Sequence, residues 1–180
     1  MRLRNTSEDA PHRSWNEVVR QHIARSEARI LHAGIFDYSF VRSIKISADL
    51  VREELNSIPA VPFLHDATLK NVLVTHDGEL SGIVDVDDLC FGDARYPIAL
   101  TLTASMVKGL PCIYAHGLLH HGGYSDDRIF RLYVAVYLLD LMSEHGHRFN
   151  GNERESTNAA RERITSLCRA AINRIADFAR

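Results

Sequence analysis

The sequence lacks the features that mark several large classes of protein. Its three cysteines are widely spaced and odd in number, so they offer neither a disulfide framework nor a C-x-x-C motif. No apolar run is long enough to span a bilayer of about 30 Å, and the opening residues MRLRNTSEDAPHRSW contain no signal-peptide core. These absences predict a soluble protein of the reducing cytoplasm, without a membrane partner.

A strong charge of one sign is also missing. The 21 lysines and arginines nearly balance the 23 aspartates and glutamates, and the formal net charge is −2. The basic residues are scattered and do not alternate with aromatic residues, which excludes the usual footprint of a nucleic-acid binder. A hydrophobic content of 46% over 180 residues is typical of one compact domain, which we expect to span residues 1–180.

Apolar residues at helical spacing dominate the chain. Ser14 followed by Glu17 resembles a capping box that opens a helix, and this helix is expected to end at Gly34. Phe130, Tyr133 and Tyr137 fall on one helical face and are expected in the core. Further helices are predicted over 48–55, 96–107, 112–120, 126–144 with Ser125 as its cap, and 153–178.

One short β-hairpin interrupts the helical pattern. Residues 72–75 and 80–84 are rich in β-formers, and Asp77-Gly78 between them is a strong signal for a two-residue turn. The sequence thus predicts two short antiparallel strands within a mainly helical protein.

The expected register of this hairpin brings polar side chains together at its open end. Counting back from the turn places Asn71 opposite Val84, and therefore beside Asp85. An amide oxygen and a carboxylate are suitable ligands for a hard cation such as Mg²⁺. We therefore expect Asn71 and Asp85 to form a metal site.

The residues around the hairpin resemble a known family. Asp66 lies five residues before Asn71, and the segments HDATLKNVLV, GELSGIVDVDD and FGDARYPIAL follow one another. This layout resembles the aminoglycoside phosphotransferase group of kinase-like enzymes. The resemblance implies an α+β, mainly α fold: a protein-kinase-like C-terminal lobe with a small β-hairpin that carries the catalytic and metal-site residues.

The resemblance also assigns roles to individual residues. It makes Asp66 the base or orienting group for a substrate hydroxyl, and Asn71 and Asp85 the ligands of Mg²⁺. Gly92-Asp93 matches the structural turn of the family, but the aspartate that often follows it is replaced by the segment RYPIA, which removes an expected anchor. The implied reaction transfers the γ-phosphate of ATP or GTP to a hydroxyl of a small, aminoglycoside-like molecule.

The nucleotide-binding half of a kinase has no counterpart in the sequence. There is no G-x-G-x-x-G motif, and Lys45 lies too few residues before Asp66 to be the lysine of a nucleotide-binding strand. We therefore expect a C-terminal lobe without its N-terminal lobe, which could be inactive alone. Its exposed lobe face is expected to produce a homo-oligomer.

The sequence is also compatible with two other functions. The lobe could be a non-catalytic binding or scaffold protein that has lost its nucleotide site. The same carboxylates could also serve a metal-dependent hydrolase.

Overall fold

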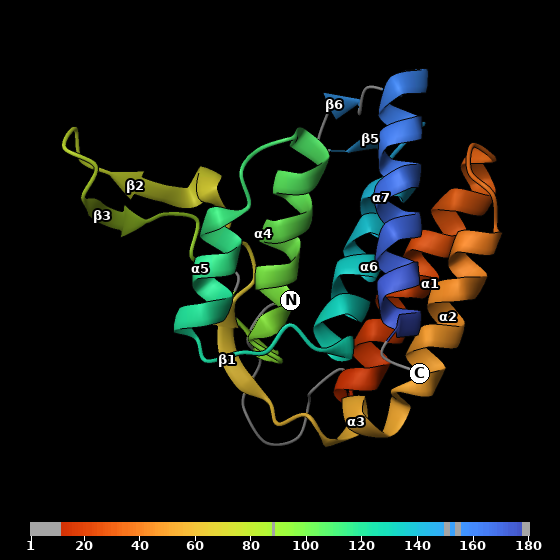
Figure 1. Cartoon of the computed structure of the whole chain (residues 1–180), viewed down its shortest axis with the longest axis horizontal. Coiled ribbons are helices and arrows are strands. Elements are labelled where there is room, and N and C mark those ends of the chain that lie inside the picture. Colours follow the sequence, from red (N-terminus) through yellow and green to blue (C-terminus); the bar gives the residue numbers. More distant parts are fainter. Residues whose placement is uncertain (1–11, 88, 150–151, 154–155, 178–180) are drawn as a thin grey trace.

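The computed structural model describes residues 12–87, 89–149, 152–153 and 156–177, and shows a helical body from which one hairpin projects (Figure 1). The helices are α1 (Trp15–Ala33), α2 (Ser39–Leu50), α3 (Arg52–Ser57), the 3₁₀ turn η1 (Leu69–Asn71), α4 (Arg95–Lys108), α5 (Ile113–His121), α6 (Arg128–Ser143) and α7 (Asn158–Asp177). The strands are β1 (Val61–Leu64), β2 (Val72–Val74), β3 (Leu80–Ile83), β4 (Leu89–Gly92), β5 (Arg148–Phe149) and β6 (Asn152–Glu153), which pair antiparallel as β1-β4, β2-β3 and β5-β6. The expected mainly helical α+β fold is confirmed.

Helix α6 forms the centre of the helical body. It is apolar around most of its circumference, as expected of a helix that is surrounded by other elements, and it packs against α1, α2, α4 and α7. Phe130, Tyr133 and Tyr137 are buried, as their spacing predicted.

The ends of the long helices show which sequence signals were reliable. Ser14 caps α1 by accepting a hydrogen bond from the backbone N–H of Glu17, and Gly34 ends the helix in the left-handed conformation at φ 62°, as predicted. The predicted cap of α6 was wrong. Asp127 caps this helix instead of Ser125, because its carboxylate accepts the backbone N–H of Phe130 at 2.9 Å.

Two helix boundaries differ from the sequence prediction. The predicted helix 48–55 covers only the end of α2 and most of α3. The start of α2 at Ser39 was missed, although the side chain of Asp37 accepts the backbone N–H of Ser39 at 2.7 Å. Helix α7 begins at Asn158 rather than at 153, since residues 152–153 pair with 148–149 as a short hairpin.

The antiparallel pairing of β1 with β4 was not expected from the sequence. Val61 lies opposite Gly92, and Leu64 lies opposite Leu89. Gly92 has φ +153°, and the indole ring of Trp15 covers it so closely that a Cβ atom would lie 2.1 Å from Trp15 Cζ3. Glycine is required here both for its backbone conformation and for the close approach of the ring.

The turn of the β2-β3 hairpin differs from the predicted two-residue turn. The N–H of Gly78 donates to the carbonyl of Thr75 at 3.0 Å, and the N–H of Thr75 donates to the carbonyl of Glu79 at 2.8 Å. Three residues therefore form the loop, and the last of them, Gly78, has φ +83°, as is common for three-residue hairpin loops.

A β-bulge compensates for the extra loop residue. Val74 pairs with Leu80 but Leu73 pairs with Gly82, so that Ser81 has no partner on the opposite strand. The added loop residue and the bulge shift the register by one residue each in opposite directions. The backbone N–H of Val84 therefore donates to the carbonyl of Asn71 at 2.9 Å, and the predicted pairing of these two residues is confirmed.

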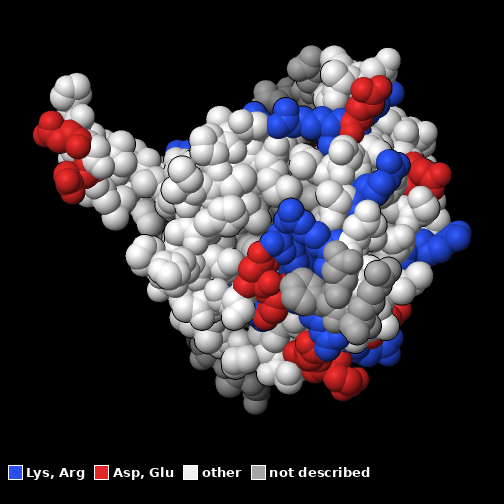
Figure 2. Space-filling model, viewed as in Figure 1, with Lys and Arg blue, Asp and Glu red and all other residues white. Residues whose placement is uncertain are grey.

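The surface differs between the hairpin and the helical body. Figure 2 shows acidic and basic side chains intermingled over the helices, whereas the hairpin is uncharged between its acidic tip and the body. The tip carries the exposed side chains of Asp77 and Glu79. Within the described residues, no helix has both the length and the apolar character that a membrane crossing requires.

A largely buried carboxylate, that of Asp140, joins α6 to α1. The Oδ2 atom of Asp140 lies 3.2 Å from His22 Nε2, and its Oδ1 atom accepts the hydroxyl of Ser26 at 3.1 Å. Arg25 and Arg29 approach the same Oδ1 atom at 3.5 and 3.4 Å. Burial alone would raise the pKa of Asp140, but His22, Arg25 and Ser26 more than offset it and lower this pKa to about 2.

We expect Gly92→Ala to lower the free energy of unfolding by about 2 kcal/mol or more, since the methyl group would collide with Trp15 and the positive φ would be strained. Urea unfolding measures the change. Gly82→Ala is the matched control, because no atom lies within 4 Å of its new methyl group. Equal stability of the two variants would contradict this account.

We expect Asp140→Asn to destabilise the protein by about 2 kcal/mol at pH 7. The pKa of Asp140 is depressed in the folded state, so its stabilisation is present above the unfolded pKa near 4 and is lost as the pH falls toward 2. The difference in unfolding free energy between the two proteins, measured by urea unfolding, should therefore be largest at pH 7 and shrink as the pH falls toward 2. Asp49→Asn, at a half-exposed site on α2, should show a smaller effect at pH 7.

Candidate active site

The loop between β1 and β2 carries Asp66 and Asn71 and is held by hydrogen bonds of its own. Asn71 is buried, and its Nδ2 atom donates to the backbone carbonyl of Asp66 at 2.8 Å. The N–H of Asn71 also donates to the carbonyl of Thr68 at 2.9 Å, which closes the 3₁₀ turn η1. The structure thus brings Asp66 and Asn71 together and fixes the loop between them.

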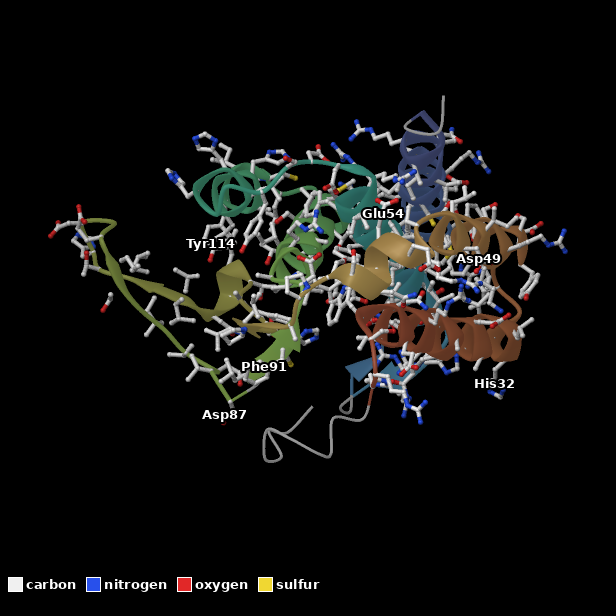
Figure 3. All side chains as sticks on the ribbon, turned by 90° about the horizontal axis from the view of Figure 1, so that it is seen from below. His32, Asp49, Glu54, Asp87, Phe91 and Tyr114 are labelled. Carbon is white, nitrogen blue, oxygen red and sulfur yellow. The ribbon has the colours of Figure 1, made fainter. Side chains whose placement is uncertain are left out.

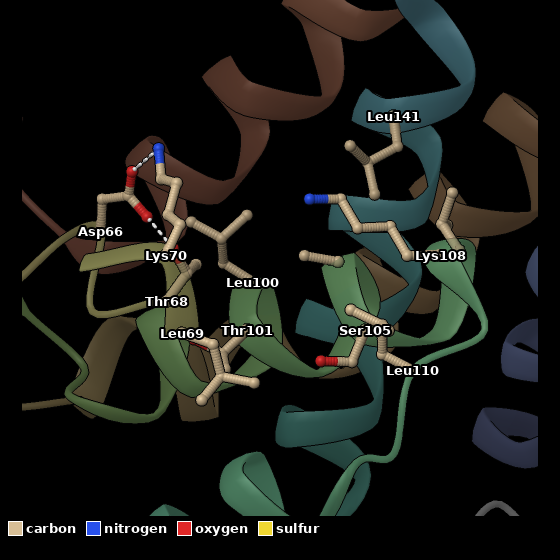
Figure 4. Close-up of a pocket in the computed structure, with 12 residues that line it drawn as sticks. Asp66, Thr68, Leu69, Lys70, Leu100, Thr101, Ser105, Lys108, Leu110 and Leu141 are labelled. Carbon is tan, nitrogen blue, oxygen red and sulfur yellow. Dashed lines mark hydrogen bonds and ion pairs between the residues drawn. The ribbon is translucent and has the colours of Figure 1, made fainter. Parts of the chain in front are cut away.

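The carboxylate of Asp66 has two side-chain partners from the same loop. Its Oδ1 atom accepts the hydroxyl of Thr68 at 2.7 Å, and its Oδ2 atom lies 2.6 Å from the ammonium group of Lys70 (Figure 4). Partial burial would raise the pKa of Asp66, but the hydrogen bonds from Lys70 and Thr68 outweigh it and lower this pKa. Asp66 is therefore ionised at neutral pH.

Asp85 begins the segment that leads from the hairpin back to the body. It is exposed, and it is the one described residue other than glycine with a positive φ, at 59°. Residues held in this region are strained and are frequent at functional sites. Because Val84 pairs with Asn71, Asp85 follows directly at the open end of the hairpin.

The β1-β4 pair connects the Asp66 loop and the segment after Asp85 to the helical body. Leu64, the last residue of β1 before the Asp66 loop, lies opposite Leu89, where β4 begins. The segment that follows Asp85 therefore returns beside the start of the loop. Figure 3 shows Asp87 at the outer bend of this segment, away from the helices, and Phe91 closer to them on β4.

The donor atoms suit a hard cation better than a transition metal. The amide nitrogen of Asn71 donates to the backbone of Asp66, so the amide oxygen of Asn71 is the atom available as a metal ligand. Asp85 supplies a carboxylate. Among the described residues, no three His, Cys, Asp or Glu side chains gather closely enough to hold a metal ion. One amide and one carboxylate fit Mg²⁺, which usually retains several waters and binds substrate phosphates.

The turn at Gly92-Asp93 is anchored by Arg95, which belongs to the segment RYPIA that replaces the expected aspartate. Arg95 donates to both carboxylate oxygens of the buried Asp93, from Nε to Oδ1 at 3.0 Å and from Nη2 to Oδ2 at 2.7 Å, and its Nη1 atom reaches Asp127 at 2.7 Å. The hydroxyl of Tyr133 donates to Asp93 at 2.8 Å. The expectation of a missing anchor was therefore wrong: the arginine of RYPIA supplies it by a bidentate ion pair.

Lys45 does not belong to this site. It lies on helix α2 rather than on a strand, and its ammonium group pairs with Glu27 of α1 at 2.6 Å. Lys45 is therefore not the lysine of a nucleotide-binding strand, as its short distance in sequence from Asp66 predicted.

A cavity of about 280 Å³ opens beside Asp66 (Figure 4). Its walls come from the Asp66 loop and η1 on one side and from α4 on the other, with Leu141 of α6 at its edge. Lys70 and Lys108 face this space from opposite walls. No signal in the sequence indicated that Lys108 lies near Asp66, because the two residues come together only through the packing of α4.

The arrangement matches a known family and known folds. The model of the phosphotransferase enzyme family matches residues 2–133. The structure of aminoglycoside phosphotransferase APH(4)-Ia superposes with a TM-score of 0.58 and 17% identity, over 89% of this chain and 52% of that one. A thermostable variant of that enzyme, in a ternary complex with ADP and hygromycin B, gives 0.58 and 16% over the same shares. Choline kinase LicA from Streptococcus pneumoniae gives 0.55 and 13%, over 88% of this chain and 55% of that one.

These comparisons show a shared fold and a family. At such identities the structural matches establish the fold alone, and the chain spans about half the length of the matched structures. No curated protein matched the sequence significantly. Because the family model covers well over half of the sequence, including Asp66, Asn71 and Asp85, the chain belongs to the phosphotransferase enzyme family (APH).

Proposed function

We propose that this protein serves the transfer of the γ-phosphate of ATP or GTP to a hydroxyl group of a small molecule. The observation that carries the proposal is the hydrogen-bonded loop in which Asn71 holds the backbone of an ionised Asp66. Phosphoryl transfer depends mainly on positioning and on neutralising charge, so a fixed carboxylate next to a cavity is what the acceptor side of such a site requires.

In the proposed reaction, Asp66 orients the acceptor. Its carboxylate accepts a hydrogen bond from the substrate hydroxyl, and the hydroxyl oxygen forms a bond to the γ-phosphorus as the bond to the leaving nucleoside diphosphate breaks. The hydroxyl proton passes to Asp66. A lowered pKa keeps this residue in the accepting state across the neutral range.

Asn71 and Asp85 are proposed to hold Mg²⁺. The ion would neutralise the phosphates of the bound nucleotide. The hydrogen bond from Asn71 Nδ2 to Asp66 fixes the orientation of the amide, so its oxygen is presented without further rearrangement. The strained backbone of Asp85 supports a functional role for its carboxylate.

We also propose that residues 1–180 correspond to the C-terminal lobe of a kinase-like enzyme. The chain spans about half the length of the matched structures, and its sequence contains no glycine-rich phosphate loop. Most contacts to a nucleotide base would then come from outside this sequence, and nucleotide binding by this chain should be weak.

Calorimetry with the purified chain tests the metal site. We expect millimolar ATP to bind in the presence of Mg²⁺, and Asp85→Asn to weaken this binding at least about tenfold, or ~1.4 kcal/mol. Asparagine keeps the shape and tolerates the positive φ of this position, so the change removes charge with little strain.

Two matched variants make the result specific. Asp87→Asn removes an exposed carboxylate from the same segment and should leave binding unchanged. Asp66→Asn should keep nucleotide binding and abolish transfer to an acceptor. Absence of Mg²⁺-dependent binding would favour a scaffold role, and release of phosphate without an acceptor would indicate a hydrolase.

A self-association surface is proposed on the projecting hairpin. Leu73, Val74 and Leu80 are exposed there, and each strand of the pair has one open edge that an identical strand could extend. A second copy related by a two-fold axis would cover both the edge and the apolar side chains.

Sedimentation velocity at increasing protein concentration tests this association. We expect a dimer or larger species, and Leu80→Lys should weaken its formation by placing a charge on the buried edge. Leu50→Lys, at a similarly exposed position on α2, should have no effect. A strictly monomeric species at high concentration would contradict the proposal.

A further inference from the structure

The side chains around the cavity beside Asp66 carry a net positive charge, whereas a site for a polycationic acceptor is expected to be negative. Three ionisable side chains line it: Asp66, Lys70 and Lys108. Lys70 is already paired with Asp66 at 2.6 Å, so the charge of that wall is largely neutralised. The ammonium group of Lys108 remains as the uncompensated charge of the cavity.

Lys108 is oriented for contact with a bound molecule. Its side chain extends from the last turn of α4 into the cavity, toward the wall that carries Asp66 and Lys70 (Figure 4). It forms no ion pair with any residue that the structure describes, although a second lysine, Lys45, is fully engaged by Glu27. Two of the three lysines in the sequence therefore face one small cavity.

The same face of α4 provides a neutral polar group. Thr101, Ser105 and Lys108 lie at helical spacing and line the cavity together. Thr101 donates its hydroxyl to the carbonyl of Pro97 at 3.0 Å, whereas the hydroxyl of Ser105 faces the cavity with no protein partner in the described part of the chain. Ser105 can therefore hydrogen-bond to a ligand that Lys108 holds.

Apart from Thr68, whose hydroxyl donates to Asp66, the remaining lining is apolar, and the cavity is small. Leu69, Leu100, Ala104 and Leu141 contribute to its walls. A volume of about 280 Å³ is at the low end of the range for small-molecule sites. The space suits a small molecule rather than a trisaccharide.

We infer that the acceptor is a small anionic alcohol, whose carboxylate or phosphate group is held by Lys108 and Ser105 while its hydroxyl group meets Asp66. The inference rests on the proposed phosphotransferase function. A cleft that carries one positive charge raises the local concentration of anions and lowers that of cations, so it would disfavour an acceptor with several ammonium groups. The acceptor class therefore differs from the aminoglycoside-like molecule that the sequence resemblance implied.

Titration of the ¹⁵N-labelled full chain by NMR tests this inference without nucleotide or Mg²⁺. The probes are glycerol 3-phosphate and glycerate as anionic alcohols, glycerol as the neutral analogue, and choline as the cationic one. We expect saturable binding of at least one anionic probe, with shift changes at Ser105 and Lys108, and at least about tenfold weaker binding of glycerol and choline.

Two variants identify the group responsible. Lys108→Gln should weaken binding of the anionic probe about tenfold or more, because it removes a charge-assisted contact. Arg169→Gln removes the same charge from an exposed position on α7 outside the cavity and should leave binding unchanged. If Lys108 serves only to complement the dipole at the end of α4, the variant will change thermal stability but not affinity, and the inference is overturned.

The remaining outcomes also decide the question. Tighter binding of choline than of the anions, or no binding of either anionic probe, overturns the inference. So does a Lys108→Gln variant that loses affinity for ATP alone, because the lysine would then belong to the nucleotide. Loss of Mg²⁺-dependent nucleotide binding in calorimetry, with the anion titration intact, would instead count against the proposed function and leave the anion site standing.

Discussion

The hydrogen bond from the buried amide of Asn71 to the backbone carbonyl of Asp66 joins the two ends of the candidate active-site loop. It lets one residue do two things: the amide nitrogen fixes the loop, and the amide oxygen remains available to a cation. The neighbouring backbone hydrogen bond to Val84 ties the same residue to the second strand, and so to Asp85. Loss of the side-chain amide would release the backbone of Asp66 and remove the oxygen offered to a cation, whereas the backbone bond to Val84 would remain.

The loop keeps its position because the strands around it are attached to the helical core. The β1-β4 pair borders the loop, and Gly92 at its far end allows Trp15 to pack directly on the backbone. Asp93 is then held by Arg95 and Tyr133, and the hydroxyl of Tyr133 accepts the indole N–H of Trp15 at 2.7 Å. A continuous set of contacts thus connects α1, α4 and α6 to the strand next to the site.

Electrostatics divide the candidate site into two parts. At the open end of the hairpin, Asn71 and Asp85 present oxygen atoms to an ion. In the cavity, Lys70 neutralises Asp66 and Lys108 adds a positive charge. The same ion pair that keeps Asp66 deprotonated also reduces its repulsion of an anionic ligand, so a carboxylate and an anion-binding lysine can share a small space.

The sequence by itself determined the local elements whose signals are short-range. The cap at Ser14, the end of α1 at Gly34 and the pair of strands around Asp77-Gly78 follow from side-chain and backbone preferences of a few adjacent residues. The pairing of Asn71 with Val84 was also obtained from the sequence, although the turn was assigned one residue too few. The bulge at Ser81 cancelled that difference.

Only the tertiary structure decided how these elements meet. The β1-β4 pair joins segments that are distant in the sequence, from Val61 with Gly92 to Leu64 with Leu89. Neither strand has a sequence pattern that predicts which strand it pairs with. The role of Arg95 depends on Asp127 and Tyr133, which approach it only when α6 packs against α4. Lys108 faces Asp66 for the same reason: this exposed side chain borders the cavity only because the packing of α4 places the Asp66 loop opposite it.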